Sequence, residues 1–137
     1  MVEDVVINKA STIERAIARV REEHAGDREN LYARQTKQDA IILNLQRACE
    51  AAIDLAMHLV STHRLGVPQD SREAFDLLAQ RAIIDAALAE KLKRMVGFRN
   101  IAVHDYQKLS LPIVEAIIAN GVADLLAFSK VALAQPG

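Results

Sequence analysis

Apolar residues recur at helical spacing in five stretches of this chain. The first stretch runs from about Val2 to His24 and ends in the polar sequence HAGDREN, where Gly26 suits a helix terminus. The second runs from about Thr36 to Arg64, and the spacing of Thr36 and Asp39 resembles a capping arrangement at its start. These patterns predict two long helices in the first half of the chain.

Three further helices are predicted in the second half. One runs from about Ser71 to Ile83, and Asp70 and Glu73 at its start have the spacing of a capping box. The next runs from near Asp85 toward His104. The last runs from about Ser110 to Ala134 and has a proline in its first turn. Because the connections are only a few residues long, sequential helices should be antiparallel neighbours.

The interior of the second helix is apolar on more than one face. Such a helix must be covered from several sides, so it is predicted to lie at the centre of a bundle. Four alanines on it allow close approach of a neighbouring helix, including one from a second subunit: Ala48, Ala51, Ala52 and Ala56. The predicted fold class is therefore all-α, a single-domain antiparallel bundle of about five helices over residues 1–137.

The composition supports this fold and indicates the compartment. Hydrophobic residues make up 51% of the chain and charged residues 26%, and the scarcity of glycine and proline favours long helices. The acidic N-terminal sequence MVEDVVINKA is unlike a signal peptide, and no uninterrupted apolar stretch approaches the roughly 18 residues of a membrane span. Cys49 lies in an apolar run and is expected to be a buried core residue. We expect a cytoplasmic protein with no membrane contact.

The most concentrated basic stretch is KLKRMVGFRNIAVH, from Lys91 to His104, which contains no acidic residue. The formal net charge of the chain is −1, so any contact with nucleic acid must use a local patch such as this one. Lys91, Lys93 and Arg94 have two open interpretations. They could stabilise a helix C-terminus, or they could neutralise RNA phosphates.

Arg99 and His104 combine two useful chemistries. Histidine transfers protons near neutral pH, and arginine forms bidentate hydrogen bonds to phosphate oxygens. Together they suffice to cleave an RNA phosphodiester, because the ribose 2′-hydroxyl is already present as a nucleophile. On a continuous helix five residues turn two side chains roughly 140° apart, so we predict that the helix ends or unwinds near His104. From these residues alone, an ordinary helix end remains the alternative.

The sequence RNIAVHDY, from Arg99 to Tyr106, resembles the R-x4-6-H motif of the HEPN superfamily, with the H-x-Y extension of its HepT-like toxins. Three longer blocks look like successive blocks of a HepT toxin: ILNLQRACEAAIDLA, LGVPQDSREAFDLLA and KRMVGFRNIAVHDYQ. They cover about Asp39 to Gln107, and the first helix also fits.

The resemblance implies an all-α homodimer that acts as a metal-independent ribonuclease without a cofactor. It also implies a partner, a minimal nucleotidyltransferase (MntA-like) antitoxin. Carried over residue by residue, Arg99 and His104 are the catalytic pair. Asn100 is the polar neighbour that orients the pair or the RNA, and Tyr106 is the tyrosine that the antitoxin modifies with AMP. Because the family includes members that act on tRNA, tRNA is the expected substrate.

The other candidate groups give weaker signals. His58 and His63 are five residues apart, which is not metal-ligand spacing on a helix, so no metal site is predicted. Asp39, Glu50 and Asp54 on the second helix could orient a histidine, but solvated or capping roles are favoured for them.

Two functions from different classes remain open. The first is an endoribonuclease toxin, in which Arg99 stabilises charge on the reacting phosphate and His104 transfers protons. The second is a non-catalytic helical module that binds RNA or nucleotide, or that occupies a transferase partner. A third possibility, that the chain is itself a nucleotidyltransferase, is discounted because it lacks a Gly-Ser element followed by paired acidic residues.

Overall fold

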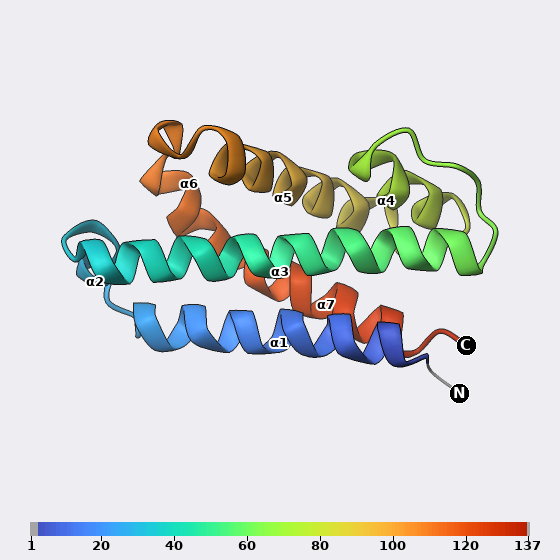
Figure 1. The fold of residues 1–137 in the computed structure, drawn as a ribbon, viewed down its shortest axis with the longest axis horizontal. Helices are drawn as coiled ribbons and strands as arrows, with labels where there is room; N and C mark the ends of the chain where they lie inside the picture. The colour runs from blue at the N-terminus through green and yellow to red at the C-terminus, as the bar shows by residue number, and fades with distance from the viewer. Residues whose placement is uncertain (1–2, 137) are drawn as a thin grey trace.

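The computed structural model describes residues 3–136, which form helices joined by short turns. Two long helices, α1 (Asp4–His24) and α3 (Gln35–Thr62), run antiparallel and side by side (Figure 1). The helix α4 (Ser71–Gln80) and the longer α5 (Ala86–His104) cover a different side of α3. The predicted all-α bundle is confirmed.

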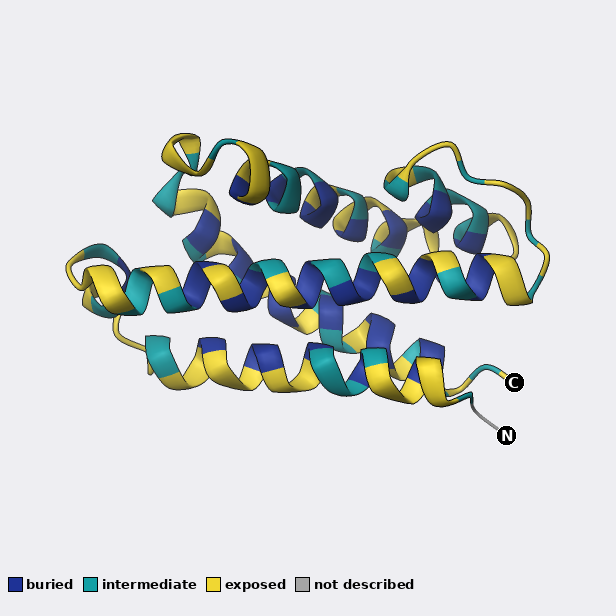
Figure 2. Ribbon diagram, viewed as in Figure 1, coloured by how far each residue is buried: buried dark blue, intermediate teal, exposed yellow. Residues whose placement is uncertain are grey.

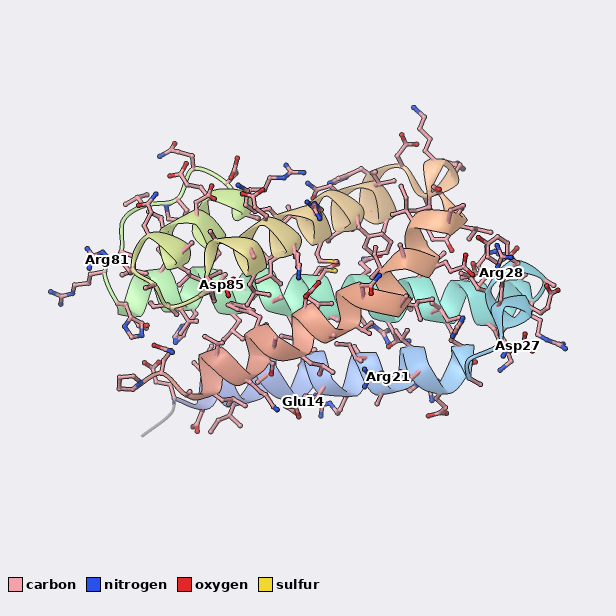
Figure 3. All side chains as sticks on the ribbon, turned by 180° about the vertical axis from the view of Figure 1, so that it is seen from behind. Glu14, Arg21, Asp27, Arg28, Arg81 and Asp85 are labelled. Carbon is pink, nitrogen blue, oxygen red and sulfur yellow. The ribbon has the colours of Figure 1, made fainter. Side chains whose placement is uncertain are left out.

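The C-terminal segment returns across the bundle behind α3, as the view from behind shows (Figure 3). It consists of α6 (Leu111–Ala116), a π-helical turn (Ile117–Gly121) and α7 (Val122–Leu133), where the sequence predicted one regular helix. A Cβ added at Gly121 would lie 2.5 Å from Cε of Met95 on α5. The glycine therefore makes room for the methionine where the two helices cross.

By length and composition alone, the segment Leu111–Leu133 could cross a membrane, although Glu115, Asp124 and Lys130 interrupt its apolar sequence. Part of it is core, because Val122, Leu125 and Phe128 are buried against the other helices. The ring of Phe128 packs edge-on against that of Phe75 on α4, with the centroids 5.5 Å apart. A core helix of a bundle has the same length and apolarity, so this property does not distinguish the two environments.

The helix α3 lies at the centre of the bundle, as predicted from its apolar faces (Figure 2). Most of its large apolar side chains, such as Ile41, Leu45 and Leu55, are buried, and the helix packs against α1, α4, α5 and α7. The alanines at 48, 51, 52 and 56 are also buried, each exposing at most 4% of its surface. They therefore allow close packing within one protomer, and the suggestion that they face a second subunit is wrong.

Two helix starts are capped by aspartates. Oδ1 of Asp70 accepts a hydrogen bond from the backbone N–H of Glu73 at 2.9 Å, which confirms the predicted cap of α4. Oδ1 of Asp85 accepts one from the N–H of Leu88 at 2.7 Å and fixes the start of α5. The direction of α5 is thus set at its first turn, which matters because its other end carries the candidate site.

The sequence-based expectations fail at two places in the connection between the long helices. The polar stretch after α1 contains an unpredicted short helix, α2 (Arg28–Tyr32), capped by Asp27. The helix α3 begins at Gln35 without a side-chain cap, so the capping role of Thr36 is wrong. Val2, the expected start of the first helix, lies outside the described residues.

Candidate active site

The C-terminal end of α5 is set by a change in backbone direction at Asp105, where φ is −154° and ψ is 52°. The N–H of Asp105 still donates to the carbonyl oxygen of Ile101 at 2.8 Å, as in a helix. A single 3₁₀ turn, Tyr106–Lys108, follows it. The helix therefore ends at His104, as predicted, and Tyr106 belongs to a separate turn.

The Arg99 guanidinium is held by two neighbours and retains a donor without a partner. Its Nη1 donates to Oδ1 of Asn100 at 3.1 Å. Oε1 of Glu50, on α3, lies 4.0 Å from Nε, which is an ion-pair distance and too long for a hydrogen bond. The Nε atom is buried and has no hydrogen-bond partner among the described residues. Buried donors without a partner are uncommon, and an anionic oxygen would satisfy this one.

His104 is exposed at the last position of α5. Among the hydrogen bonds and ion pairs of residues 3–136, none joins it to Arg99. Because α5 is helical through both residues, their side chains leave the helix roughly 140° apart. The structure places the two groups at one helix end but does not bring them into contact.

Tyr106 points its hydroxyl at the central helix. The phenolic O–H donates to Oδ1 of Asp39 on α3, with the two oxygens 2.7 Å apart. Burial and the contact with Asp39 raise the pKa of Tyr106 to about 12. In the same turn, Nζ of Lys108 pairs with Oδ2 of Asp105 at 3.3 Å. Tyr106 is therefore a neutral phenol near pH 7, tied to α3 by one strong hydrogen bond.

The acidic residues that approach the site were only weakly indicated by sequence. Asp39 and Glu50 contact Tyr106 and Arg99, whereas Asp54 pairs with Lys9 on α1 at 3.0 Å. One signal in the sequence could have linked Asp39 to Glu50. They are eleven residues apart, which is three turns of a helix, so their side chains lie on the same face, roughly 20° apart. Only the packing of α5 against α3 shows that this shared face meets the motif.

The basic stretch of α5 is largely engaged by acidic neighbours. Lys93 pairs with Asp76 at 2.9 Å and with Glu90 at 3.0 Å, and these hydrogen bonds raise its pKa. Lys91 lies 3.9 Å from a carboxylate oxygen of Asp124 on α7. Arg94 is exposed and makes no ion pair within the described part of the chain. Of the three, Arg94 is thus the residue with its full charge available to an RNA phosphate.

An apolar groove of about 840 Å³ lies between α5 and the C-terminal segment. Its lining includes Met95, Phe98 and Ile101 from α5 and Ile113 from α6. Ile101 exposes 41% of its surface and Ile113 exposes 55%, and Lys108 of the 3₁₀ turn also lines the groove. The groove therefore extends from the middle of α5 to the candidate site.

The remaining titratable candidates lie elsewhere. Cys49 is buried and unpaired, and burial raises its pKa to about 12, which confirms its expected place in the core. Nε2 of His58 contacts a carboxylate oxygen of Glu3 at 2.9 Å. No group of three or more His, Cys, Asp or Glu side chains within residues 3–136 is arranged to hold a metal ion.

Comparison with known proteins identifies the family. The family model described as "Ribonuclease HepT-like" matches residues 13–132. This chain belongs to the HepT-like ribonuclease family. It is 47% identical over 132 residues to a protein of Shewanella oneidensis named "mRNA nuclease HepT", covering 96% of this chain and 98% of that protein. The resemblance noted from the R-x4-H-x-Y sequence is thus confirmed over nearly the whole chain.

Solved structures of HepT-like proteins have the same fold. One is a tri-AMPylated HEPN toxin of Shewanella oneidensis in complex with an MNT antitoxin, with a TM-score of 0.91 and 47% identity, covering 97% of this chain and 99% of that one. Another is described as a toxin–antitoxin with AMP-PNP, with a TM-score of 0.88 and 45% identity, covering 95% of this chain and 98% of that one. The chain is therefore a HEPN-type helical protein of a ribonuclease family.

Proposed function

We propose that this chain is a metal-independent endoribonuclease toxin that cleaves RNA with Arg99 and His104. The observation that carries the proposal is the end of α5, where a buried arginine donor without a partner lies five residues from an exposed histidine. A phosphate oxygen at Nε of Arg99 would complete the guanidinium's hydrogen bonds.

In the proposed reaction, the ribose 2′-hydroxyl attacks the adjacent phosphorus and the bond to the 5′-oxygen of the next nucleotide breaks. His104 transfers protons between the attacking hydroxyl, the leaving oxygen and water. Arg99 stabilises the negative charge that develops on the phosphate oxygens, and Asn100 orients the guanidinium through its hydrogen bond. The product is a 2′,3′-cyclic phosphate or its hydrolysis product.

We infer that the working form is a homodimer. Within one protomer Arg99 and His104 diverge, so a single site offers few groups to an RNA strand. Two copies related by a twofold axis would combine two such ends into one wider cationic cleft. Light scattering at micromolar concentration should report twice the monomer mass of 15.1 kDa, and a monomer would contradict the composite cleft.

The proposed partner is a minimal nucleotidyltransferase antitoxin that transfers AMP to Tyr106. The Shewanella HEPN toxin, which is AMPylated and bound to an MNT antitoxin, supports this pairing. AMP on Tyr106 would add bulk and negative charge two residues from His104. It would compete with the scissile phosphate for Arg99 and repel the RNA backbone.

The assay uses the purified chain and labelled RNA in EDTA. The wild type should cleave the RNA, and His104→Ala should abolish cleavage while its far-UV circular dichroism remains helical. Retained RNA binding without cleavage by either protein would instead establish the non-catalytic binding module. The family resemblance predicts faster cleavage of a tRNA than of an unstructured mRNA fragment, whereas the name of the Shewanella relative predicts the reverse.

We also expect a cytoplasmic location, where RNA and a transferase partner are both present. Fractionation of cells that express an inactive His104→Ala variant should place the chain with the soluble proteins. Recovery in the membrane fraction would give the apolar segment Leu111–Leu133 a role outside the core.

A further inference from the structure

The hydrogen bond between Tyr106 and Asp39 joins residues 67 positions apart, and the proposed RNA cleavage makes no use of it. We propose that Asp39 is the base that accepts the phenolic proton of Tyr106 during nucleotidyl transfer. This inference rests on the proposed modification of Tyr106. It assigns activation of the acceptor hydroxyl to this chain and not to the transferase.

The geometry of the pair suits direct proton transfer. The oxygens of Tyr106 and Asp39 are 2.7 Å apart, within the range of O–H···O bonds to a carboxylate. Oδ1 of Asp39 also accepts a hydrogen bond from Nε2 of Gln35 at 2.9 Å, one turn earlier on α3. The carboxylate is therefore held in place from its own helix. Tyr106 exposes 41% of its surface, so a partner that holds a nucleotide can approach this side chain from solvent.

The chemistry of the acceptor requires such a base. With a pKa of about 12, the phenol of Tyr106 is ionised in only about one molecule in 10⁵ at pH 7. Attack by the neutral phenol must therefore be accompanied by loss of its proton. Asp39 supplies an acceptor that already holds that proton in a hydrogen bond, and other charges of the turn, Asp105 and Lys108, are paired with each other.

Nucleotidyl transfer to Tyr106 exchanges one oxygen–phosphorus bond for another. Oη of Tyr106 attacks the α-phosphorus of a nucleoside triphosphate bound by the transferase, and a new oxygen–phosphorus bond forms. The bond from the α-phosphorus to the bridging oxygen breaks, and pyrophosphate leaves. The phenolic proton passes to Oδ1 of Asp39 and from there to water.

The second tyrosine of the chain provides an internal comparison. The hydroxyl of Tyr32 also donates to a carboxylate, Oε1 of Glu115, at 3.2 Å. That carboxylate is neutralised by Arg28, whose Nε lies 2.8 Å from Oε2 and whose guanidinium stacks on the Tyr32 ring. The Glu115 carboxylate is therefore already engaged by a cation, whereas that of Asp39 pairs with none within residues 3–136, and Tyr32 should not be modified.

The experiment follows AMP transfer by intact mass. The wild type, Asp39→Asn, Asp39→Glu and Asp54→Asn are each mixed with the MNT antitoxin of the Shewanella complex, ATP and Mg²⁺ at pH values from 6 to 9. Asp54 is a matched control because it is an exposed carboxylate on the same helix, paired with Lys9. Peptide mapping assigns the first added AMP to Tyr106 or Tyr32.

Asp39→Asn keeps an oxygen that can accept the hydrogen bond but removes the base. Its first transfer to Tyr106 should be at least about 100-fold slower at pH 7, because general bases contribute about 10²- to 10⁴-fold. Its rate should also rise about tenfold per pH unit as phenolate becomes the nucleophile, while the wild-type rate stays level. Asp39→Glu should recover part of the rate, and Asp54→Asn should match the wild type.

The outcomes separate the inference from the proposed function. If Asp39→Asn is modified as fast as the wild type, Asp39 is not the base. If it is slow but has the wild-type pH profile, Asp39 only positions the turn, and the base assignment is overturned. If the wild type gains no AMP on Tyr106, the proposed modification itself fails. Circular dichroism of each variant checks that the helices are intact.

Discussion

The hydrogen bond from Arg99 to Asn100 allows the orientation of the arginine to be tested apart from its charge. Nη1 lies 3.1 Å from Oδ1 of Asn100, and the Arg99 side chain is 31% exposed. Hydrogen bonds to charged groups contribute about 1.5–3 kcal/mol when buried, and partial exposure reduces this one to about 1 kcal/mol. Asn100→Ala should therefore lower kcat/KM for RNA cleavage about fivefold.

Removing the charge of Arg99 should lower kcat/KM far more than removing the hydrogen bond that orients the guanidinium. Arg99→Ala takes away the group that stabilises developing charge on the phosphate, and comparable losses reduce rates about 10²- to 10³-fold. If Asn100 acts only through Arg99, the Asn100→Ala change should have no further effect in the Arg99→Ala background.

The assay is a double-mutant cycle on a fluorescent RNA substrate in EDTA, with kcat/KM measured for all four proteins. A fivefold effect of Asn100→Ala in both backgrounds would refute the orienting role, because Asn100 would then act on the RNA independently. Asp54→Asn is the control for a polar substitution at an exposed site, because the Asp54 carboxylate pairs with Lys9 on α1 and makes no ion pair or hydrogen bond with Arg99 among the described residues.

Three further predictions concern single groups. The change in the free energy of unfolding caused by Gly121→Ala, measured with urea, should be about 1 kcal/mol more favourable in a Met95→Ala background than in the wild type, because the added Cβ then meets no methionine. Equal changes in the two backgrounds would show that contact with Met95 carries no energetic cost. Cys49 should resist a thiol reagent at pH 8 until urea unfolds the chain, since burial raises its pKa to about 12; rapid labelling of the folded protein would contradict this. The phenolate absorbance of Tyr106, obtained as the difference between the wild type and Tyr106→Phe, should titrate with a midpoint near pH 12. The midpoint should move to lower pH in Asp39→Asn, because this change removes the carboxylate that holds the phenolic proton. An unchanged midpoint would leave burial as the sole cause of the raised pKa.

The helices were predictable because periodicity and caps are local properties. The starts of α4 and α5 follow from single aspartates whose side chains bond the next turn. The short α2 was missed although Asp27 caps it, because five residues are too few to show an apolar repeat. The π turn was missed because it arises where Gly121 meets Met95 of another helix, which no local pattern reveals.

The candidate site also has residues that local sequence could indicate and residues that only the folded structure brings to it. Arg99, His104 and Tyr106 lie within eight residues of sequence, so a motif could indicate them as candidates and a helix end at His104 could be expected. Asp39 and Glu50 are brought to the motif only by the packing of α3 against α5. Local sequence therefore indicated the reactive groups, while their acidic partners required the tertiary arrangement.

The described ends of the chain have a practical consequence for experiments. Both lie together at one end of the bundle, and the 3₁₀ turn after α5 lies at the opposite end (Figure 1). A fluorescent protein or an affinity tag joined to either terminus would emerge far from the 3₁₀ turn and the candidate site beside it. Labelled forms for imaging or immobilisation can therefore be made at both ends without obstructing access to the candidate site.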